Sequence, residues 1–284
     1  MRSAAPGMML RKYGLAPSKD RGQNFLADRN AAAKVVDAIA PGPDDVVVEV
    51  GSGFGAITFG LVERARSVVA VELDAGIAAA FRSEYGDVPG LRLIEGDFLE
   101  LDLSTVASDE SAERLIVAGN LPYGITSPVI GKVVRDRGIV RRAVVMVQAE
   151  VGARLAAAAG ESEYSALTVM LRSAADVRKH FLVRRTCFVP RPAVESAVVG
   201  IDFRDAPTLE SSPDVFEAVV RAAFGRRRKM LRSGLRPLLE PEGITTDALA
   251  ERSGLDLTRR GETLTVAEFD RLALSLDELR GRTT

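Results

Sequence analysis

The segment from residue 46 to residue 55 constrains the fold of this chain most strongly. It reads VVVEVGSGFG, so a mostly β-branched apolar run leads directly into a glycine-rich turn. A continuous run of this kind is typical of a strand buried on both faces of a parallel sheet. A helical pattern then follows to about residue 65. The segment therefore predicts a strand, a tight turn and a helix.

Three glycines in this turn, Gly51, Gly53 and Gly55, follow the spacing G-x-G-x-G. Glycine lets a ligand approach the backbone closely, so the turn predicts a nucleoside-type ligand. Ala56 stands where the dinucleotide fingerprint G-x-G-x-x-G requires its last glycine. Taken alone, the turn is a weak indication.

Acidic residues follow the next two apolar runs. The run 67–71 ends in Glu72, and an acid at this place can accept hydrogen bonds from both ribose hydroxyls. The run 91–94 is followed by Asp97, which can accept from an adenine amine, and by Phe98, which can pack against the ring. Dinucleotide-binding folds and methyltransferases share this arrangement, so it does not separate them.

Further apolar runs alternate with helical patterns up to about residue 203. This alternation predicts an α/β fold with a doubly wound, mostly parallel sheet that binds ligands at the carboxyl ends of its strands. The composition changes near residues 204–213, and helical periodicity continues to the C-terminus. We expect a basic, irregular and partly flexible segment 1–22, an α/β domain 23–205 and a small helical domain 206–284.

The apolar run at 115–118 leads into Asn120, Leu121, Pro122 and Tyr123. The Asn120 side-chain carbonyl and the backbone carbonyl of Leu121 or Pro122 are two acceptors that could hold the exocyclic amine of a planar base. Pro122 lacks an N–H and stiffens the turn, and Tyr123 offers a face for stacking. The alternative is an ordinary turn, because Asn and Pro are common turn residues.

Phe188 begins a stiff loop, FVPRP, between two later apolar runs. Its ring could present a second aromatic face to the base. A hydrophobic plug is an equal alternative.

The net charge of −1 does not indicate a nucleic-acid-binding protein, but the distribution of charge does. Basic residues concentrate in 1–27, 172–191 and 221–236, and the last stretch contains no acid. Such patches on a neutral chain fit an RNA-binding face, although a solvated helix face is the alternative for each one. We expect the third stretch to be helical. Its bases are Arg221, Arg226, Arg227, Arg228, Lys229, Arg232 and Arg236.

Other classes of protein are disfavoured. No apolar run approaches the ~18–20 residues of a membrane span, and the N-terminus lacks a signal pattern, so we expect a cytoplasmic protein. Cys187 and His180 are the only residues of their types, which excludes a disulfide framework and a Cys/His zinc cluster. We expect no metal, and a monomer.

In their order, these motifs resemble the ribosomal RNA adenine dimethyltransferases, specifically the small-subunit 16S rRNA enzymes that use S-adenosylmethionine. The similarity runs from about residue 20 to 275. It rests on residues 22–26, 49–53, 71–74, 96–97, 120–123, 188–192, 196–199 and 223–229. Ser52 departs from the proline of many relatives, and Gly124 from the usual Asn or Ser. Gly124 could loosen the loop after Tyr123.

The resemblance implies a Rossmann-like methyltransferase domain at 23–205 and an RNA-binding domain at 206–284. It implies donor contacts at Gln23, Asn24, Leu26, Gly51, Gly53, Glu72, Leu73, Asp97, Phe98 and Asn120. It places the target adenine among Asn120, Leu121, Pro122, Tyr123 and Phe188. RNA contacts are expected at Arg221, Arg226, Arg227, Arg228, Lys229 and Arg232.

The implied reaction is N6,N6-dimethylation of two adjacent adenosines in the 3′-terminal hairpin of 16S rRNA, within an assembling 30S subunit. The sister enzymes that dimethylate one 23S rRNA adenine and confer macrolide resistance share the same clamp. Leu121, the helix expected at residues 226–229 and the sequence 260–262 favour the small-subunit group. A non-catalytic ribosome-assembly factor and a DNA adenine methyltransferase remain as alternatives.

Overall fold

The computed structural model describes residues 4–18, 22–205, 209–226 and 229–281. Its contacts divide the chain into two compact units. The sheet unit comprises residues 1–152 and 176–205, and the helical unit comprises residues 153–175 and 206–284.

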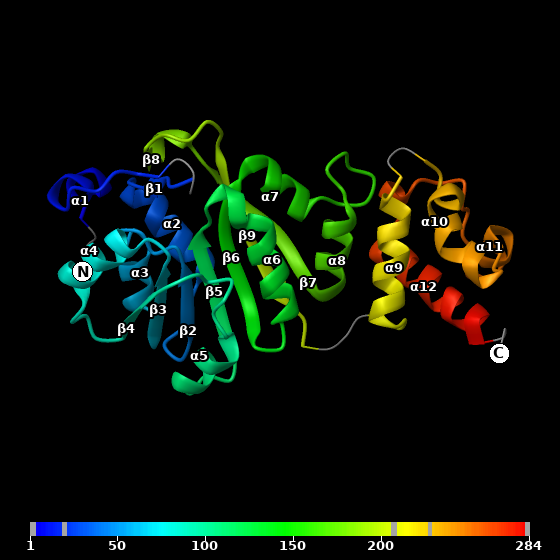
Figure 1. Cartoon of the computed structure of the whole chain (residues 1–284), viewed down its shortest axis with the longest axis horizontal. Coiled ribbons are helices and arrows are strands. Elements are labelled where there is room, and N and C mark those ends of the chain that lie inside the picture. The colour runs from blue at the N-terminus through cyan, green and yellow to red at the C-terminus, as the bar shows by residue number, and fades with distance from the viewer. Residues whose placement is uncertain (1–3, 19–21, 206–208, 227–228, 282–284) are drawn as a thin grey trace. The chain divides into compact units, whose positions relative to one another are not determined.

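The sheet unit is built on seven strands in the order β4-β3-β2-β5-β6-β9-β7 (Figure 1). They are β2 (Val46–Val50), β3 (Ser67–Glu72), β4 (Leu91–Glu95), β5 (Leu115–Asn120), β6 (Val140–Gln148), β7 (Ala175–Val183) and β9 (Ser196–Phe203). Strands β2 to β6 pair in parallel, and β9 pairs antiparallel with β6. The predicted α/β sheet is therefore confirmed. Its order reverses between β2 and β5, which opens a crevice at their carboxyl ends.

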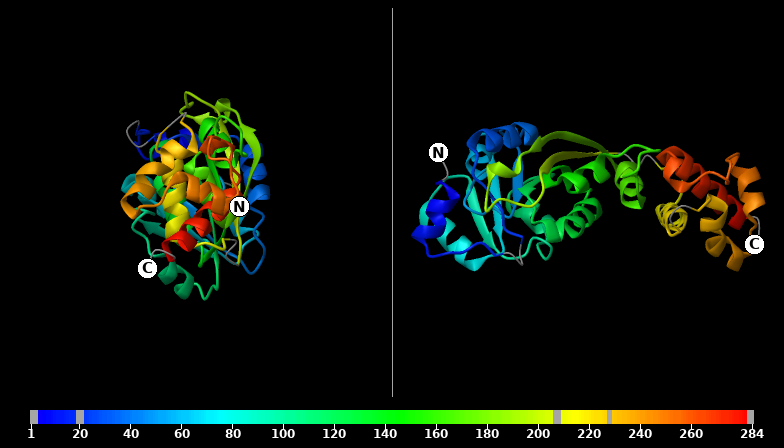
Figure 2. Two further views of the ribbon diagram at one scale, coloured as in Figure 1. Left: turned by 90° about the vertical axis from the view of Figure 1, so that its right-hand side faces the viewer. Right: turned by 90° about the horizontal axis from the view of Figure 1, so that it is seen from above.

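Helices cover both faces of this sheet. They are α2 (Arg29–Ile39), α3 (Thr58–Val62), α4 (Ala75–Tyr85), α5 (Leu103–Asp109), α6 (Thr126–Arg135) and α7 (Ala149–Ala156). Because side chains alternate along a strand, Ile116 and Ala118 of β5 pack in one core with Val35 and Ile39 of α2. Figure 2 shows α2 and α6 on opposite sides of the sheet. Strands β2, β3, β5, β6 and β9 are thus largely buried on both faces, as their composition predicts, whereas β4 is partly buried and β7 is exposed at several positions.

The expectation of an irregular N-terminal segment is wrong for residues 6–12, which form α1 (Pro6–Lys12). Pro6 suits the first helical turn because its missing N–H would be unpaired there. Met9 is buried in an aromatic cluster with Phe59 and Phe81, and the Tyr13 hydroxyl donates to Glu84 at 2.6 Å. These long-range contacts hold α1 in place.

Two short strands, β1 (Phe25–Leu26) and β8 (Phe188–Val189), form a separate antiparallel ribbon that the sequence did not suggest. Leu26 pairs with Phe188, and the Ala27 N–H donates to the Cys187 carbonyl at 2.7 Å. The ribbon joins the segment before α2 to the loop between β7 and β9.

The helical unit surrounds its own hydrophobic core. It contains α8 (Ala166–Ala174), α9 (Pro213–Phe224), α10 (Leu231–Leu239), α11 (Thr246–Ser253) and α12 (Val266–Gly281). Phe216, Leu235 and Phe269 are fully buried in it. Residues 153–175 also belong to this core through Val169 and Tyr164, so the unit is larger than the domain expected from residue 206 onward. The shift in composition after residue 204 did not reveal this earlier segment.

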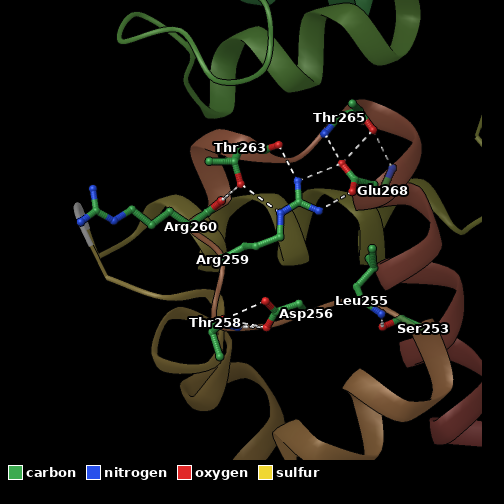
Figure 3. Close-up of polar contacts among 9 residues, drawn as sticks. All are labelled: Ser253, Leu255, Asp256, Thr258, Arg259, Arg260, Thr263, Thr265 and Glu268. Atoms are coloured by element: carbon green, nitrogen blue, oxygen red, sulfur yellow. Dashed lines mark hydrogen bonds and ion pairs between the residues drawn. The ribbon is translucent and has the colours of Figure 1, made fainter.

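A polar cluster fixes the loop that precedes α12 (Figure 3). Arg259 donates to the Glu268 carboxylate at 2.5 Å and to the Thr263 carbonyl at 2.7 Å. Glu268 in turn accepts the Thr265 N–H, while the Thr265 hydroxyl accepts the Glu268 N–H, which caps the helix. The Arg260 side chain extends away from this cluster.

In the described ranges, none of the helices is both long enough and apolar enough to cross a membrane.

Substitution of Val169 tests the assignment of residues 153–175. Val169 is fully buried, and α8 contacts both α9 and α12. We expect Val169→Ala to cost about 1–3 kcal/mol and to speed amide hydrogen exchange in α9 and α12. The matched change Val133→Ala, at a fully buried position of α6, should speed exchange in the sheet unit instead. The assignment fails if Val169→Ala affects β2 to β6 and leaves α9 and α12 unchanged.

Candidate active site

A cavity of about 270 Å³ lies at the carboxyl ends of β2, β3, β4 and β5, within the sheet unit. We call it the main cavity. Its walls come from the segments that follow these strands and from the residues before β1. It is lined by residues 22–25, 50, 51, 53, 71–74, 96–98 and 120–125.

The glycine turn forms one wall of the main cavity. Gly51, Gly53 and Gly55 have φ angles of 70°, 55° and 81°, which side chains other than glycine rarely adopt. The Gly51 N–H donates to the Val71 carbonyl at 2.9 Å. A Cβ atom on Gly53 would lie 3.1 Å from the Phe25 ring. The turn is therefore held against β3, and neighbouring rings leave little room for a side chain at Gly53 or Gly55.

Glu72 connects the glycine turn to the end of β3. Its carboxylate accepts the Gly53 N–H at 2.9 Å through Oε2 and the Asp74 N–H at 3.0 Å through Oε1. The side chain is only 6% exposed. Each carboxylate oxygen has a second lone pair, so Glu72 can still accept from the hydroxyls of a ribose in the cavity.

The next wall suits a flat heterocycle. Leu73 is exposed, while Phe98 is buried in the wall of the cavity with the Lys132 ammonium 5.9 Å from its ring centroid. Asp97 accepts the Leu99 N–H at 2.8 Å, which fixes its carboxylate at the end of β4. An adenine ring could pack here on apolar atoms and donate its amine to Asp97. The residues present therefore fit the adenosine part of S-adenosylmethionine.

Asn120 and the turn after it form the opposite wall. The Asn120 Nδ2 donates to the Asn24 carbonyl at 2.8 Å, which assigns the orientation of the amide and leaves Oδ1 as an acceptor. The Pro122 carbonyl accepts the Ile125 N–H at 3.1 Å. Of the two backbone acceptors that the sequence leaves open, we therefore assign Leu121. Together, Asn120 Oδ1 and the Leu121 carbonyl can hold one amine.

Most of the predicted site residues meet in the main cavity. Of the predicted donor contacts, Leu26 alone is outside its lining and instead lines a second cavity of about 40 Å³. Asn120, Leu121, Pro122 and Tyr123 all line the main cavity.

Phe188 does not line the main cavity, so the structure does not place its ring against a base there. It is 3% exposed and packs in the core beneath α2, because β8 pairs with β1. The hydrophobic-plug interpretation describes this position.

Several lining residues were not predicted from the sequence. They are Gly22, Phe25, Val50, Val71, Asp74, Gly96, Gly124 and Ile125. Most of them adjoin predicted residues. Asp74 could have been recognised from the sequence, because Asp is a preferred N-cap residue. In the structure it caps α4 and accepts the Gly76 N–H at 3.0 Å.

The basic stretch 221–236 is not one helix, contrary to expectation. Arg226 and Lys229 are exposed in the connection between α9 and α10, and Arg227 and Arg228 lie outside the described residues. Helix α9 ends at Phe224 with Gly225 as its C-cap residue, and Met230 forms an isolated bridge with Arg260 before α10 begins. Three further bases have acidic neighbours: Arg221 pairs with Glu217 at 2.6 Å, Arg232 lies 3.9 Å from Asp247, and Arg236 lies 3.7 Å from Glu240.

Glu49 is a buried acid close to the glycine turn, where it lines the smaller cavity. Its pKa is raised from 4.5 to about 8, chiefly by burial and to a lesser degree by the charge of Glu72. The Thr58 hydroxyl, which donates at 2.6 Å, acts in the opposite direction. Glu49 is therefore largely protonated at neutral pH.

Within the described ranges, no group of three or more His, Cys, Asp or Glu residues is arranged to hold a metal ion.

Comparison with known proteins supports this reading of the cavity. The family model described as "Ribosomal RNA adenine dimethylase" matches residues 16–276. A Ribosomal RNA small subunit methyltransferase A from Geobacillus thermodenitrificans is 39% identical over 284 residues, covering 96% of each chain.

Two solved structures share the fold. The 23S rRNA methyltransferase ErmE is 26% identical with a TM-score of 0.73 and covers 89% of this chain and 100% of its own. A dimethyladenosine transferase from Plasmodium falciparum is 24% identical with a TM-score of 0.77 and covers 90% of this chain and 98% of its own.

The raised pKa of Glu49 predicts how stability changes with pH. The folded protein holds a proton that the unfolded chain releases above pH 4.5, so its stability falls as the pH rises toward 8. Glu49→Gln removes this loss while keeping an acceptor for Thr58. We expect its stability relative to the wild type to increase between pH 5 and pH 8, by up to about 4 kcal/mol. Urea unfolding at several pH values measures this. Glu100→Gln, at an exposed carboxylate, should run parallel to the wild type; a parallel curve for Glu49→Gln would contradict the prediction.

Proposed function

Because the chain belongs to the ribosomal RNA adenine dimethylase family, we propose that it dimethylates N6 of two adjacent adenosines in the 3′-terminal hairpin of 16S rRNA. The methyl donor is S-adenosylmethionine, and the substrate is the assembling small subunit in the cytoplasm. One observation carries the proposal: the acids Glu72 and Asp97 share a cavity with the Asn120–Tyr123 turn. A nucleoside site therefore adjoins a site for an exocyclic amine.

The walls described above support the proposed donor contacts. Glu72 would accept from the ribose hydroxyls and Asp97 from the adenine amine, while Leu73 and Phe98 pack against the ring. The glycine turn admits the rest of the donor because it carries no side chains that would fill the space. S-adenosylmethionine supplies an electrophilic methyl group at this place.

Asn120 and Leu121 would hold the adenine that accepts the methyl group. A base within a helix cannot expose N6, so the target adenosine must be flipped out of its stack. Stacking on Tyr123 would offset the lost stacking by ~1–3 kcal/mol. Asn120 Oδ1 and the Leu121 carbonyl would accept the two N–H groups and thereby direct the nitrogen lone pair along one line. Most of the rate enhancement would then come from orientation.

The described bases of the helical unit would contact phosphates. Arg226 and Lys229 are exposed in one connection, and Arg221 and Arg232 lie on the helices to either side of it. Phosphate contacts fix register without reading sequence, so the shape of an exposed RNA hairpin would select the substrate.

Methylation of 23S rRNA is the second candidate, because the likeness to ErmE extends over 89% of this chain. The higher identity to relatives named as small-subunit methyltransferases favours 16S rRNA. A binding role in subunit assembly would use the same RNA contacts.

Transfer of tritium from labelled S-adenosylmethionine tests these alternatives. The acceptors are small subunits that lack the modification, large subunits and naked 16S rRNA. We expect label as N6,N6-dimethyladenosine in small-subunit RNA alone. Label in 23S rRNA would identify the second candidate, and donor binding without any transfer would favour an assembly role.

Two substitutions should separate amine positioning from donor binding. Asn120→Ala removes the amine acceptor, and we expect transfer to fall about 100-fold or more, a larger factor than the rise in the Kd of the donor, which Asn120 is also expected to contact. Glu72→Gln places an amide NH2 donor opposite the N–H of Gly53 or Asp74, so one hydrogen bond of the turn is lost. We expect the Kd of the donor to rise at least about 10-fold. Calorimetry with S-adenosylmethionine and the tritium assay measure the two effects. Equal losses of donor affinity in both variants would contradict this division of roles.

The RNA contacts predict a change in salt dependence. Arg226→Ala combined with Lys229→Ala should lower the slope of log affinity against log salt by about 1–2, since each phosphate contact contributes roughly 0.7–0.9. Filter binding to small subunits between low and moderate salt measures the slope. Arg252→Ala removes a base that is paired with Glu278 and serves as the matched control. An unchanged slope in the double variant would remove these residues from the RNA interface.

A further inference from the structure

Ser196 is a polar residue at the start of an otherwise apolar buried strand. Its side chain is 0% exposed, and the residues after it, Ala197, Val198 and Val199, are also fully buried. A buried hydroxyl is unfavourable unless it forms a hydrogen bond. The Ser196 Oγ lies 3.1 Å from the Tyr123 hydroxyl. The serine is therefore satisfied by the residue that is expected to stack on the target base.

Ser196 is itself held firmly by the sheet. It pairs with Gln148 at the end of β6, and the Ala149 N–H donates to the Glu195 carbonyl at 2.9 Å. The same end of β6 holds the turn after β5, because the Leu121 N–H donates to the Met146 carbonyl at 3.0 Å. Ser196 thus provides a fixed point beside the turn that carries Tyr123.

Tyr123 needs such a fixed point because its turn offers little else. It begins a single turn of 3-10 helix (Tyr123–Ile125) without a side-chain cap, and none of the three residues is buried. A Cβ atom on Gly124 would meet nothing within 4 Å, so the residue that follows Tyr123 faces open space. A hydrogen bond at the phenolic oxygen limits the swing of the whole ring about the Cα–Cβ bond.

We propose that Ser196 is a positioning residue for methyl transfer, whose hydroxyl holds the Tyr123 ring in the place where the flipped adenine stacks. The inference rests on the proposed function. It complements the hydrogen bond from Asn120 to the Asn24 carbonyl. That bond fixes the amide that would bind the adenine amine, and the Ser196–Tyr123 bond fixes the ring on which the base would stack. Both groups are then ordered before the RNA binds, which reduces the cost of binding in the reactive geometry.

Three variants test the hydrogen bond between Ser196 and Tyr123. Ser196→Ala and Tyr123→Phe each remove one hydroxyl and keep the strand and the ring. We expect each to lower kcat on unmodified small subunits about 5- to 30-fold, since one hydrogen bond is lost, with little change in the KM for S-adenosylmethionine. The double variant should be no worse than either single variant, because both remove the same bond. Ser275→Ala, which removes a buried hydroxyl bonded to the Arg271 carbonyl in the helical unit, should retain wild-type kcat.

A spectroscopic measurement separates positioning from a loss of stability. Small subunits carrying 2-aminopurine at one target adenosine bind without methylation at that base, and its emission is quenched when it stacks. We expect higher emission with bound Ser196→Ala or Tyr123→Phe than with the wild type or Ser275→Ala, because the stacked fraction falls.

The outcomes are distinguishable. Wild-type kcat and emission in both single variants would overturn the inference, and so would losses that multiply in the double variant. Absence of transfer by the wild-type protein would overturn the proposed function, and the inference with it.

Discussion

The carboxylate of Glu72 is the contact on which the rest of the site depends. It accepts one N–H from the glycine turn after β2 and one from the segment that begins α4. Two loops that follow neighbouring strands are thereby joined by a single buried side chain. Nearby Glu49 is also buried and is largely protonated at neutral pH, chiefly because burial raises its pKa.

The core of the fold and most of the cavity could be predicted from the sequence, because both depend on local signals. The β-branched run 46–50, its glycines and the acids at the ends of β3 and β4 each indicate their own position. The α1 helix, the β1–β8 ribbon and the burial of Phe188 depend on pairings between distant segments, which leave no periodic pattern. The same limit explains the boundary near residue 153: Val169 joins the helical core through residues that follow it much later in the chain.

The distribution of charge along the chain indicated an RNA-binding role, whereas the net charge did not. Several arginines of the helical unit are paired, including Arg259 with Glu268 and Arg280 with Glu242. These ion pairs hold loops and helices together, so the paired arginines offer less positive charge to RNA phosphates. Arg226 and Lys229 differ in lying on an exposed connection between helices. The position of a base relative to the acids around it therefore decides its role more than the local count does.

The ribbon of β1 and β8 has a consequence for the biosynthesis of the protein. Phe25 and Leu26 leave the ribosome early, whereas their partners Phe188 and Val189 are translated much later. Until then, the wall that contains Gln23 and Asn24 has no strand to pair with, and Ser196 has not yet joined the sheet. Contacts between such distant segments form late and slow folding. A nascent chain would thus reach methyltransferase competence only after nearly the whole sheet unit has been synthesised.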